Sequence, residues 1–363
     1  MTRRETLPDL PGVVSAGQLH RTVDRIAAAQ RPDGLLPWFP GHHADPWDHV
    51  EAAMALSLGG LRDEARAAFR WSARSQADDG SWPMEIVDGE VTDASTDANQ
   101  CLYLAVGLWH DWLLTGDRSF VAELWPTVRR AAGFALDLQR PDGAITWSRD
   151  PAGVPDPDAL LTGSACMVLS LRCAMALAEL VGDQHPDWEL SAARLAHAVA
   201  EHPADAFADK TRFSMDWYYP VLGGAVRGPA AQELLRRRWT EFVVPGRGIR
   251  CVADRPWVTA AETCELVLAL DCAGDRAAAT ALLRDVQFLR TADGDYWTGW
   301  VFPEEVIWPQ QRTTWTAATV VLAADALARH SAATGLFRAS DLPPLLDVGP
   351  CTPQCHALSR GQG

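Results

Sequence analysis

The sequence has few basic residues and no long apolar run. Asp and Glu number 47 against 32 Lys and Arg, which gives a net charge of -15, and Lys210 is the only lysine. A nucleic-acid binder needs a basic face, so this balance argues against a nucleic-acid partner. No stretch reaches the roughly 18 consecutive apolar residues of a membrane span. The opening MTRRETLPDLPGVV has no apolar core behind its arginines. We therefore expect no membrane span, no secretory signal and a cytoplasmic protein.

A strong metal-binding signature is also missing. Most of the eight cysteines lie in apolar segments, where a free cysteine packs as a small core residue. These are Cys101, Cys166, Cys173, Cys264 and Cys272. The tail GPCTPQCH holds Cys351, Cys355 and His356, whose spacing suits zinc or a disulfide, but a fourth ligand is not obvious. We predict no metal and no cofactor.

Apolar residues instead recur at intervals of three and four, with charged residues on the opposite side. This period is that of an amphipathic helix. The clearest examples span residues 15–30, 61–76, 117–139 and 275–290. No convincing period-two alternation appears, so the sequence predicts an all-α protein.

A short turn sequence recurs between the helices. QRPDG ends at Gly34, QADDG at Gly80, a second QRPDG at Gly143, and TADG at Gly294. Asp-Gly just after a helix supplies a left-handed residue that ends the helix and turns the chain. Two degenerate copies fill the long gap before the last of these turns, in residues 207–219 and 245–257. The sequence therefore predicts six helical hairpins.

Each turn is followed by a second helix that is apolar nearly all round, as an inner ring of helices is. These helices begin with polar and aromatic residues, near 45–56, 95–109, 160–171, 214–225, 258–270 and 312–327. The helices before the turns are more amphipathic, as an outer ring is. Six such hairpins close into an (α/α)6 barrel whose inner-helix starts meet at one mouth. We predict a single toroid domain over residues 1–340 and a C-terminal tail over 341–363.

One segment, residues 96–147, carries a family pattern. An inner helix leads to the turn Thr115, Gly116 and Asp117, and then to Leu-Trp-Pro at 124–126 and an Asp-Gly turn. This order resembles the six-hairpin glycosidases of the glucoamylase type. The resemblance implies an (α/α)6 toroid that hydrolyses a glycosidic bond.

Two other segments point in a different direction. FRWSARSQADDGSW (69–82) is similar to the Gln–Gly–Trp repeat of squalene–hopene cyclases. RTTWTAATVVLAADAL (312–327) is similar to the Gln-Thr-Ala-Trp-Ala-Leu element of the same superfamily, which includes prenyltransferase β-subunits. The cyclases' acid motif, Asp-x-Asp-Asp, is not present, and its nearest counterpart is DASTDAN with Asp93 and Asp97. The prenyltransferase zinc set of Asp, Cys and His has no clean counterpart either.

A glycosidase uses two carboxyl groups that flank the bond, one protonated and one ionised. The candidate catalytic residues are Asp48, Asp93, Asp97 and Glu262. Asp97 has the densest polar surroundings in sequence, so we expect it to act as acid or base. The alternative is that Asp97 only caps its helix, although Ser95 or Thr96 could supply that cap instead.

Sixteen tryptophans are many for this length. Aromatic faces stack on sugars and also stabilise carbocations. We expect aromatic and polar side chains to hold a substrate in the mouth, with Asp48, Asp97, Asp216 and Glu262 facing one cavity beside Trp47, Trp217 and Trp315. The predicted substrate-binding residues are Trp47, His49, Glu51, Trp82, Glu85, Asn99, Asp216, Trp217, Tyr218, Trp257, Trp300, Glu304, Arg312 and Trp315.

The leading interpretation is a carbohydrate-active enzyme whose substrate is a small molecule, an oligosaccharide or a glycoconjugate. Two alternatives stay open: an isoprenoid enzyme of the terpene-cyclase or prenyltransferase type, and a non-catalytic toroid that binds a ligand or a partner. A polar mouth with tryptophans would favour the carbohydrate-active enzyme. A deep apolar pocket with one buried acid would favour the isoprenoid enzyme, and the lack of a carboxylate pair would favour the non-catalytic toroid. The sequence does not indicate an oligomeric state.

Overall fold

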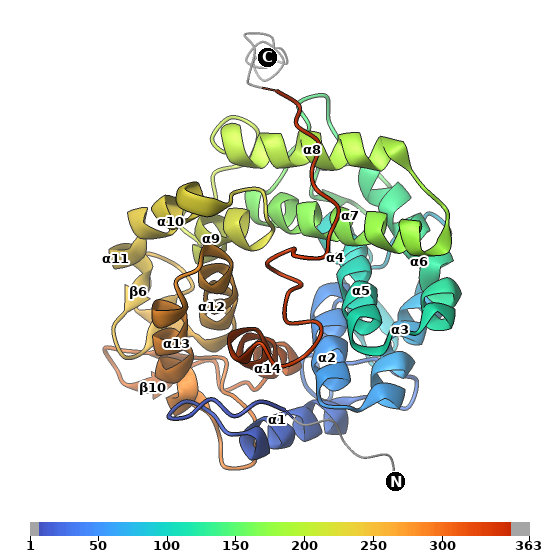
Figure 1. Cartoon of the computed structure of the whole chain (residues 1–363). Helices are drawn as coiled ribbons and strands as arrows, with labels where there is room; N and C mark the ends of the chain where they lie inside the picture. The colour runs from blue at the N-terminus through green and yellow to red at the C-terminus, as the bar shows by residue number, and fades with distance from the viewer. Residues whose placement is uncertain (1–6, 350–363) are drawn as a thin grey trace.

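The computed structural model describes residues 7–349, and its helices form two concentric rings (Figure 1). The outer helices are α1 (Ala16–Ala29), α3 (Arg62–Ser75), α6 (Arg118–Leu136), α8 (Pro186–Glu201), α10 (Gly228–Arg237) and α13 (Arg276–Asp285). The inner helices are α2 (Pro46–Leu58), α4 (Ala98–Leu102) continued by α5 (Leu104–Thr115), α7 (Leu161–Val181), α9 (Ser214–Leu222), α12 (Ala260–Ala273) and α14 (Thr314–Ala328). The short helices α11 (Trp239–Phe242) and η1 (Val286–Leu289) follow α10 and α13. Outer and inner helices alternate along the chain, so the predicted all-α barrel of six hairpins is confirmed.

The inner helices close a ring. α2 packs against α5, the ring continues through α7, α9, α12 and α14, and α14 packs back against α2. In α12 every residue from Ala260 to Asp271 is buried. The outer helix α1, in contrast, buries only one stripe, formed by Leu19, Thr22, Val23 and Ile26. This contrast between an all-round apolar helix and an amphipathic one is what separates the two rings.

The repeated turns bind each outer helix to the next. Gln30, Gln76 and Gln139 each donate from Nε2 to the carbonyl of the glycine in their own turn and to a carbonyl of the following outer helix, at 2.9–3.0 Å. At the last turn, Thr22 of α1 donates its hydroxyl to the Gly294 carbonyl at 2.8 Å. The glutamine bridge thus recurs at three successive turns, and a different contact, from Thr22, joins the last turn to the first outer helix.

The glycines of these turns lie against a neighbouring backbone. Gly80 has a φ of +95°, and a Cβ there would lie 2.3 Å from the carbonyl oxygen of Arg130 in α6. Gly34 has a φ of +99° and the same 2.3 Å approach to the Ala67 carbonyl oxygen of α3. Both the left-handed backbone and the close approach require glycine.

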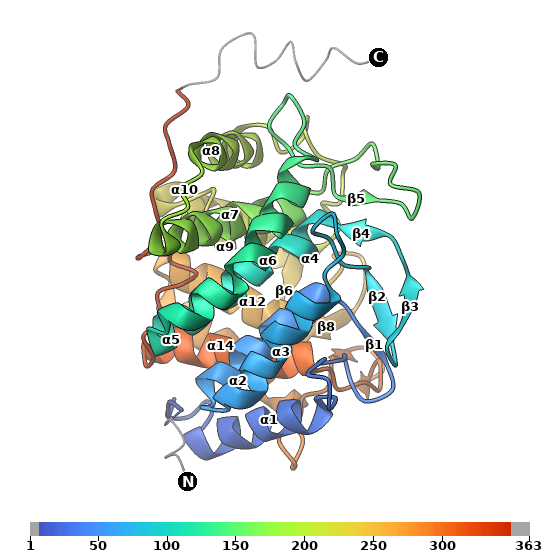
Figure 2. The same cartoon turned by 90° about the vertical axis from the view of Figure 1, so that its right-hand side faces the viewer.

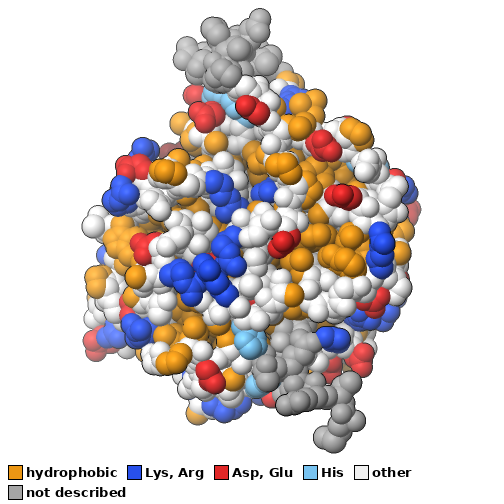
Figure 3. Space-filling model, in the orientation of Figure 1, with side chains coloured by type: hydrophobic (Ala, Val, Ile, Leu, Met, Phe, Trp, Pro, Cys, Tyr) orange, Lys and Arg blue, Asp and Glu red, His pale blue; other side chains and the backbone are white. Residues whose placement is uncertain are grey.

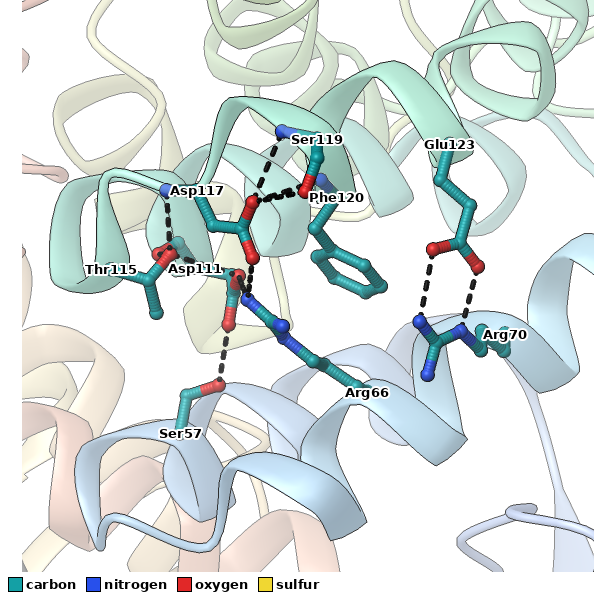
Figure 4. A network of polar contacts seen from close by, with 9 residues as sticks. All are labelled: Ser57, Arg66, Arg70, Asp111, Thr115, Asp117, Ser119, Phe120 and Glu123. Atoms are coloured by element: carbon teal, nitrogen blue, oxygen red, sulfur yellow. Dashed lines mark hydrogen bonds and ion pairs between the residues drawn. The ribbon is translucent and has the colours of Figure 1, made fainter.

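A polar network ties four helices together where α2 and α5 end (Figure 4). Asp117 caps α6 by accepting from the Ser119 N–H at 3.0 Å, and its other oxygen accepts from Arg66 of α3 at 2.7 Å. Asp111 of α5 is buried and accepts from the Ser57 hydroxyl of α2 at 3.3 Å. The Thr-Gly-Asp turn therefore has a structural role at the end of the barrel away from the inner-helix starts.

Short strands border the inner-helix starts. β1 (His43–Ala44), β2 (Glu85–Val87) and β3 (Glu90–Asp93) form one antiparallel sheet, and β4 (Thr96–Asp97) pairs with β5 (Ser148–Arg149). β6 (Val243–Val244), β7 (Gly248–Arg250), β8 (Trp257–Thr259), β9 (Gly299–Val301) and β10 (Val306–Ile307) form a five-stranded sheet in the order β10-β9-β8-β7-β6. β1 to β5 lie together on one side of the molecule (Figure 2). Strands of two to four residues are too short to leave a period-two pattern, which is why the sequence shows none.

The chain after α14 crosses the opposite face of the ring (Figure 1). Arg172 of α7 donates from Nε to the Pro343 carbonyl at 2.9 Å and from Nη2 to the Leu342 carbonyl at 3.4 Å. Arg227 donates to the Phe337 carbonyl at 3.1 Å. Acidic, basic and hydrophobic side chains are mixed on this face (Figure 3). The C-terminal segment therefore covers one end of the barrel and leaves the inner-helix starts at the other.

α7 is long and apolar enough to cross a membrane, judged by length and composition alone. Most of this stretch is buried inside the toroid, against α5, α6, α8 and α9. Its position in the inner ring accounts for its composition.

Candidate active site

α2 places acidic side chains at the start of the inner ring. Asp45 is its N-cap, with Oδ1 accepting from the N–H groups of Trp47 and Asp48, both at 2.9 Å, and Pro46 opens the helix. These residue types favour a helix start. Asp48 follows in the first turn with 6% of its surface exposed, and Glu51 lies one turn deeper with 3% exposed. α2 thereby holds two buried carboxyl groups on one face, three residues apart.

α12 repeats this arrangement on the other side of α14. Glu262 lies in its first turn and Glu265 one turn deeper, and both are buried. Tyr218 of α9 donates its hydroxyl to Glu265 Oε2 at 2.5 Å, and Tyr219 donates to Oε1 at 2.7 Å. We refer to Asp48, Glu51, Glu262 and Glu265 as the buried acid cluster.

Aromatic side chains surround this cluster. Tyr103, between α4 and α5, donates its hydroxyl to Glu51 Oε1 at 2.7 Å. The Trp47 ring packs edge-on against Tyr103 and Tyr219, with centroids 5.7 and 5.9 Å apart. It is tilted against the ring of Trp315 in α14, with centroids 6.4 Å apart. Side chains from α2, α9, α12, α14 and the α4–α5 junction therefore meet at the mouth of the inner ring.

Three carboxyl groups of the cluster, those of Asp48, Glu51 and Glu265, hold their protons to an unusually high pH. Burial raises the pKa of Asp48 well above its usual range, and the charges of Asp45, Glu51 and Glu265 raise it further. Burial raises the pKa of Glu51 to about 7. Burial and the charge of Glu51 also raise the pKa of Glu265. Buried acids that cannot all ionise together are suited to donating and accepting protons near neutral pH.

Three buried polar atoms near Glu51 have no hydrogen-bond partner within residues 7–349. They are Glu51 Oε2, Trp47 Nε1 and Trp315 Nε1. The indole N–H groups of Trp315 and Trp47 point at the Glu51 carboxylate and, after the Tyr103 hydroxyl, lower its pKa as hydrogen-bond donors. Neither contact reaches full hydrogen-bond geometry. Buried polar groups are almost always satisfied in native proteins. These three atoms therefore indicate a place for a further polar group.

Asp97 is itself the N-cap of α4, which is the structural role that the sequence allowed beside catalysis, and neither Ser95 nor Thr96 supplies the cap. Asp97 Oδ1 accepts from the Gln100 N–H at 3.0 Å. Burial raises the pKa of Asp97 to about 6, and the charge of Asp45 adds to the increase. The catalytic role assigned to Asp97 from sequence stays a prediction.

Two other predicted residues at inner-helix starts are buried there. Asp216, in the first turn of α9, accepts from the Thr162 hydroxyl of α7 at 2.6 Å, and burial raises its pKa. Asn99 in α4 is 5% exposed, and its Oδ1 has no hydrogen-bond partner in the described part of the chain.

His49 is a core residue, so its prediction as a substrate contact is wrong. The Leu36 N–H donates to His49 Nδ1 at 3.1 Å. Nε2 then carries the proton and donates to the Ala68 carbonyl of α3 at 3.0 Å. Burial lowers the pKa of this imidazole to about 4, so it is neutral. With both nitrogens engaged inside the protein, it has none to offer a ligand.

Trp82 and Trp217 also pack between the rings and do not line the mouth. Trp82 donates its indole N–H to the Ser72 carbonyl of α3 at 3.0 Å. Trp217 stacks on Phe242 and donates to the Leu234 carbonyl of α10 at 3.0 Å. Both side chains point toward the outer ring. The sequence of an aromatic-rich helix start does not indicate this direction.

Four predicted residues belong to the strand rim. Glu85 in β2 pairs with Asp93 in β3, and Asp93 Oδ1 accepts from the Ser95 N–H at 2.9 Å. Trp257 in β8 donates its indole N–H to the Trp308 carbonyl at 2.7 Å. Glu304 is exposed in the turn between β9 and β10. The structure thus gives Asp93 a part in shaping the rim, outside the buried acid cluster.

Trp300 and Arg312 are engaged with outer parts of the molecule. Trp300 in β9 packs under the guanidinium of Arg247, 4.7 Å from the ring centroid, and edge-on against Phe288 of η1. Arg312 forms an ion pair with Asp295 of the last Asp-Gly turn at 3.4 Å. Neither contact leads toward the buried acid cluster, so the assignment of these two residues to substrate binding is not supported.

Sequence reasoning missed Glu265, Tyr103 and Tyr219. Two signals could have found them. Two acids three residues apart occur in α2 and again in α12, inside helices that are otherwise apolar. The chain has only four tyrosines, and three of them donate to the buried acid cluster.

No group of three or more His, Cys, Asp or Glu side chains among residues 7–349 is arranged to hold a metal ion. The tail residues Cys351, Cys355 and His356 lie outside the described residues.

Comparison with known proteins identifies the chain. No family model matches the sequence. A protein of Mycolicibacterium hassiacum, "MMP endo-(1,4)-3-O-methyl-alpha-D-mannosidase", is 54% identical over 339 residues, which cover 93% of this chain and 94% of that protein. The chain belongs to the family of this mannosidase. It is a glycoside hydrolase.

Solved structures agree on the fold of this glycoside hydrolase. A glycosidase variant in complex with glucose is 16% identical with a TM-score of 0.67, covering 86% of this chain and 97% of that one. A rhamnosidase from Klebsiella oxytoca with rhamnose bound is 17% identical with a TM-score of 0.62, covering 88% and 65%. A D-mannose isomerase is 11% identical with a TM-score of 0.64, covering 85% and 96%. The resemblance to six-hairpin glycosidases is confirmed, and the isoprenoid alternative finds no support in these comparisons.

Proposed function

We propose that this glycoside hydrolase cleaves internal α-(1,4) bonds in chains of 3-O-methyl-D-mannose. The observation that carries the proposal is its 54% identity to the Mycolicibacterium hassiacum mannosidase across 93% of the chain. The buried acid cluster at the mouth of the toroid supplies the paired carboxyl groups that such hydrolysis needs.

Within the cluster, the proposal assigns the general acid to Asp48. Three carboxylates, those of Asp45, Glu51 and Glu265, face it and favour its protonated form. A carboxyl group that is still protonated near neutral pH can donate to the departing sugar oxygen.

Glu262 is the second carboxyl group of the proposal. It lies in the first turn of α12, where the helix dipole favours a negative charge. α2 and α12 both pack against α14, which supports an approach of Asp48 and Glu262 to the mouth from two sides. Glu262 acts as the base that activates water or as the nucleophile that attacks the sugar carbon.

The test is hydrolysis of a defined substrate by the full chain. We expect an α-(1,4)-linked 3-O-methyl-D-mannose oligosaccharide to be cut at internal bonds, with products of intermediate length seen first by mass spectrometry. An unmethylated α-(1,4)-mannose chain and an α-(1,4)-glucose chain of equal length are the matched controls and should react more slowly. Failure to cut the methylated chain, or release of single sugars from one end only, would contradict the proposal.

Variants test the two assigned residues. Asp48→Asn and Glu262→Gln should each lower kcat by a factor of about 10²–10⁴ while the protein stays folded. Asp63→Asn, in the first turn of the outer helix α3, is the matched control, since Asp63 is exposed. Near-normal turnover in either cluster variant would remove that residue from the mechanism.

A further inference from the structure

The floor of the mouth contains one carboxylate that is only half satisfied. Glu51 Oε1 accepts from the Tyr103 hydroxyl at 2.7 Å, whereas Oε2 is buried and accepts from no group among residues 7–349. Its neighbour Glu265 differs, since both of its oxygens accept phenol hydrogen bonds. The missing bond is therefore specific to Glu51.

Two unpaired donors lie beside this oxygen. Trp47 Nε1 and Trp315 Nε1 are buried, and each has no acceptor among the described residues. The two indole rings are 6.4 Å apart between centroids and come from the first turns of α2 and α14. Both lie close enough to lower the pKa of Glu51. Leaving a buried donor or acceptor unpaired is energetically costly, so a fold that keeps three together favours a ligand that pairs them.

One hydroxyl group matches this set. A hydroxyl has one hydrogen to donate and two lone pairs that accept. When Glu51 is ionised, the site offers one acceptor, Glu51 Oε2, and two donors, the indole N–H groups of Trp47 and Trp315. A methyl ether at the same position would have no hydrogen for Glu51 and would leave the carboxylate unpaired.

We propose that Glu51, Trp47 and Trp315 bind one free hydroxyl of the sugar unit in the mouth and thereby select which hydroxyl groups of the substrate must be unmethylated. This inference rests on the proposed function, which places a sugar chain in the mouth. In an α-(1,4)-linked 3-O-methyl-D-mannose chain, O1 and O4 form the links and O3 carries the methyl group. The hydroxyl is therefore O2 or O6, and both have the required chemistry.

The experiment compares an α-(1,4)-linked tetrasaccharide of 3-O-methyl-D-mannose, the parent, with two analogues. One analogue lacks the hydroxyl groups at C2, and the other lacks those at C6. We expect one analogue, and not the other, to lose a factor of about 10⁴ in kcat/KM, because a site built to bind a hydroxyl strongly rejects a substrate that lacks it. Which analogue fails identifies the hydroxyl. If the parent binds without being cut, the proposed function fails. The dissociation constants of the parent and the two analogues then still test whether the site selects a hydroxyl group.

Variants connect the discrimination to these side chains. Trp315→Phe and Trp47→Phe keep an aromatic ring but remove one donor each. Each should therefore reduce kcat/KM for the parent about tenfold and leave kcat/KM for the analogue that lacks the bound hydroxyl unchanged. Glu51→Gln should likewise reduce the ratio of kcat/KM for the parent to kcat/KM for this analogue. Trp109→Phe is the matched control, because Trp109 in α5 also has a buried indole N–H without a partner in residues 7–349. In Trp109→Phe, the ratio of kcat/KM for the parent to kcat/KM for the analogue should equal the ratio in the unchanged protein.

Two results would overturn the inference. The first is equal kcat/KM for the parent and both analogues. The second is a set of variants that lower kcat/KM for the parent and the analogues by the same factor, or that lower only the melting temperature. That pattern would mean that a buried water molecule, and not the substrate, pairs the three groups.

Discussion

At the scale of single residues, the protonation of Asp48 is coupled to that of Glu265. Burial raises the pKa of Asp48, and the negative charge of Glu265 contributes to the increase. A general acid must be protonated, so its activity is lost as the pH rises through its pKa. Glu265→Gln removes the charge and keeps the shape, so the pKa of Asp48 should fall. We expect the alkaline limb of the kcat profile to move to lower pH.

The control for this prediction is an acid far from the mouth. Glu123→Gln changes an exposed side chain of α6 that pairs with Arg70 at 2.6 Å (Figure 4), and it should leave both limbs in place. An alkaline limb that stays fixed in Glu265→Gln would show that Glu265 does not influence the catalytic acid.

Asp97 offers a second prediction at this scale. Asparagine caps a helix about as well as aspartate, so Asp97→Asn keeps the start of α4 and removes a carboxyl group whose pKa burial raises to about 6. If Asp48 is the acid, kcat should fall less than about tenfold in Asp97→Asn, compared with about 10²–10⁴ in Asp48→Asn. Steady-state kinetics of both variants decide between the two acids. A larger loss in Asp97→Asn would return the acid role to Asp97.

At the scale of elements, the glycine of each repeated turn joins two outer helices. Gly80 and Gly153 both have a positive φ, of +95° and +83°. A Cβ on Gly80 would lie 2.3 Å from the Arg130 carbonyl oxygen, whereas a Cβ on Gly153 would meet nothing within 4 Å. Both changes to alanine strain the backbone, but only the first also displaces α6. We expect Gly80→Ala to lower the free energy of unfolding by about 1–3 kcal/mol more than Gly153→Ala.

Chemical denaturation of the two glycine variants gives this difference directly. Equal losses would show that the left-handed backbone alone, and not the contact with α6, makes glycine necessary in the repeated turn.

At the scale of the whole molecule, the two ends of the barrel have different tasks. The inner-helix starts carry the acids, and the C-terminal segment covers the other end through Arg172. Arg172→Met removes the donors to the carbonyls of Pro343 and Leu342 and keeps a long side chain. We expect faster amide hydrogen exchange in residues 336–343 and an unchanged kcat. A loss of kcat without a change in exchange would show that the two ends are coupled.

Much of this architecture is determined by the sequence alone. The spacing of apolar residues separates inner from outer helices, because a helix covered on all sides has no need of a polar face. The Gln-x-x-Asp-Gly turns mark the hairpins, because the left-handed glycine and the glutamine that donates to its carbonyl lie within five residues of chain. The family pattern in residues 96–147 likewise covers only one inner helix and the outer helix and turn that follow it, and it pointed correctly to a glycosidase toroid.

The identity of the site residues was decided only by the tertiary structure. Asp48 and Asp97 both lie at the start of an inner helix. Asp97 is the N-cap of α4, whereas the N-cap of α2 is Asp45 and Asp48 lies in the first turn after it. Trp47 faces the mouth and Trp217 faces α10, although both begin inner helices. An inner helix is apolar on every side, so its sequence carries no sign of which side faces the axis of the barrel. That direction is set by how the six hairpins pack into a closed ring, and it determines which carboxyl groups meet.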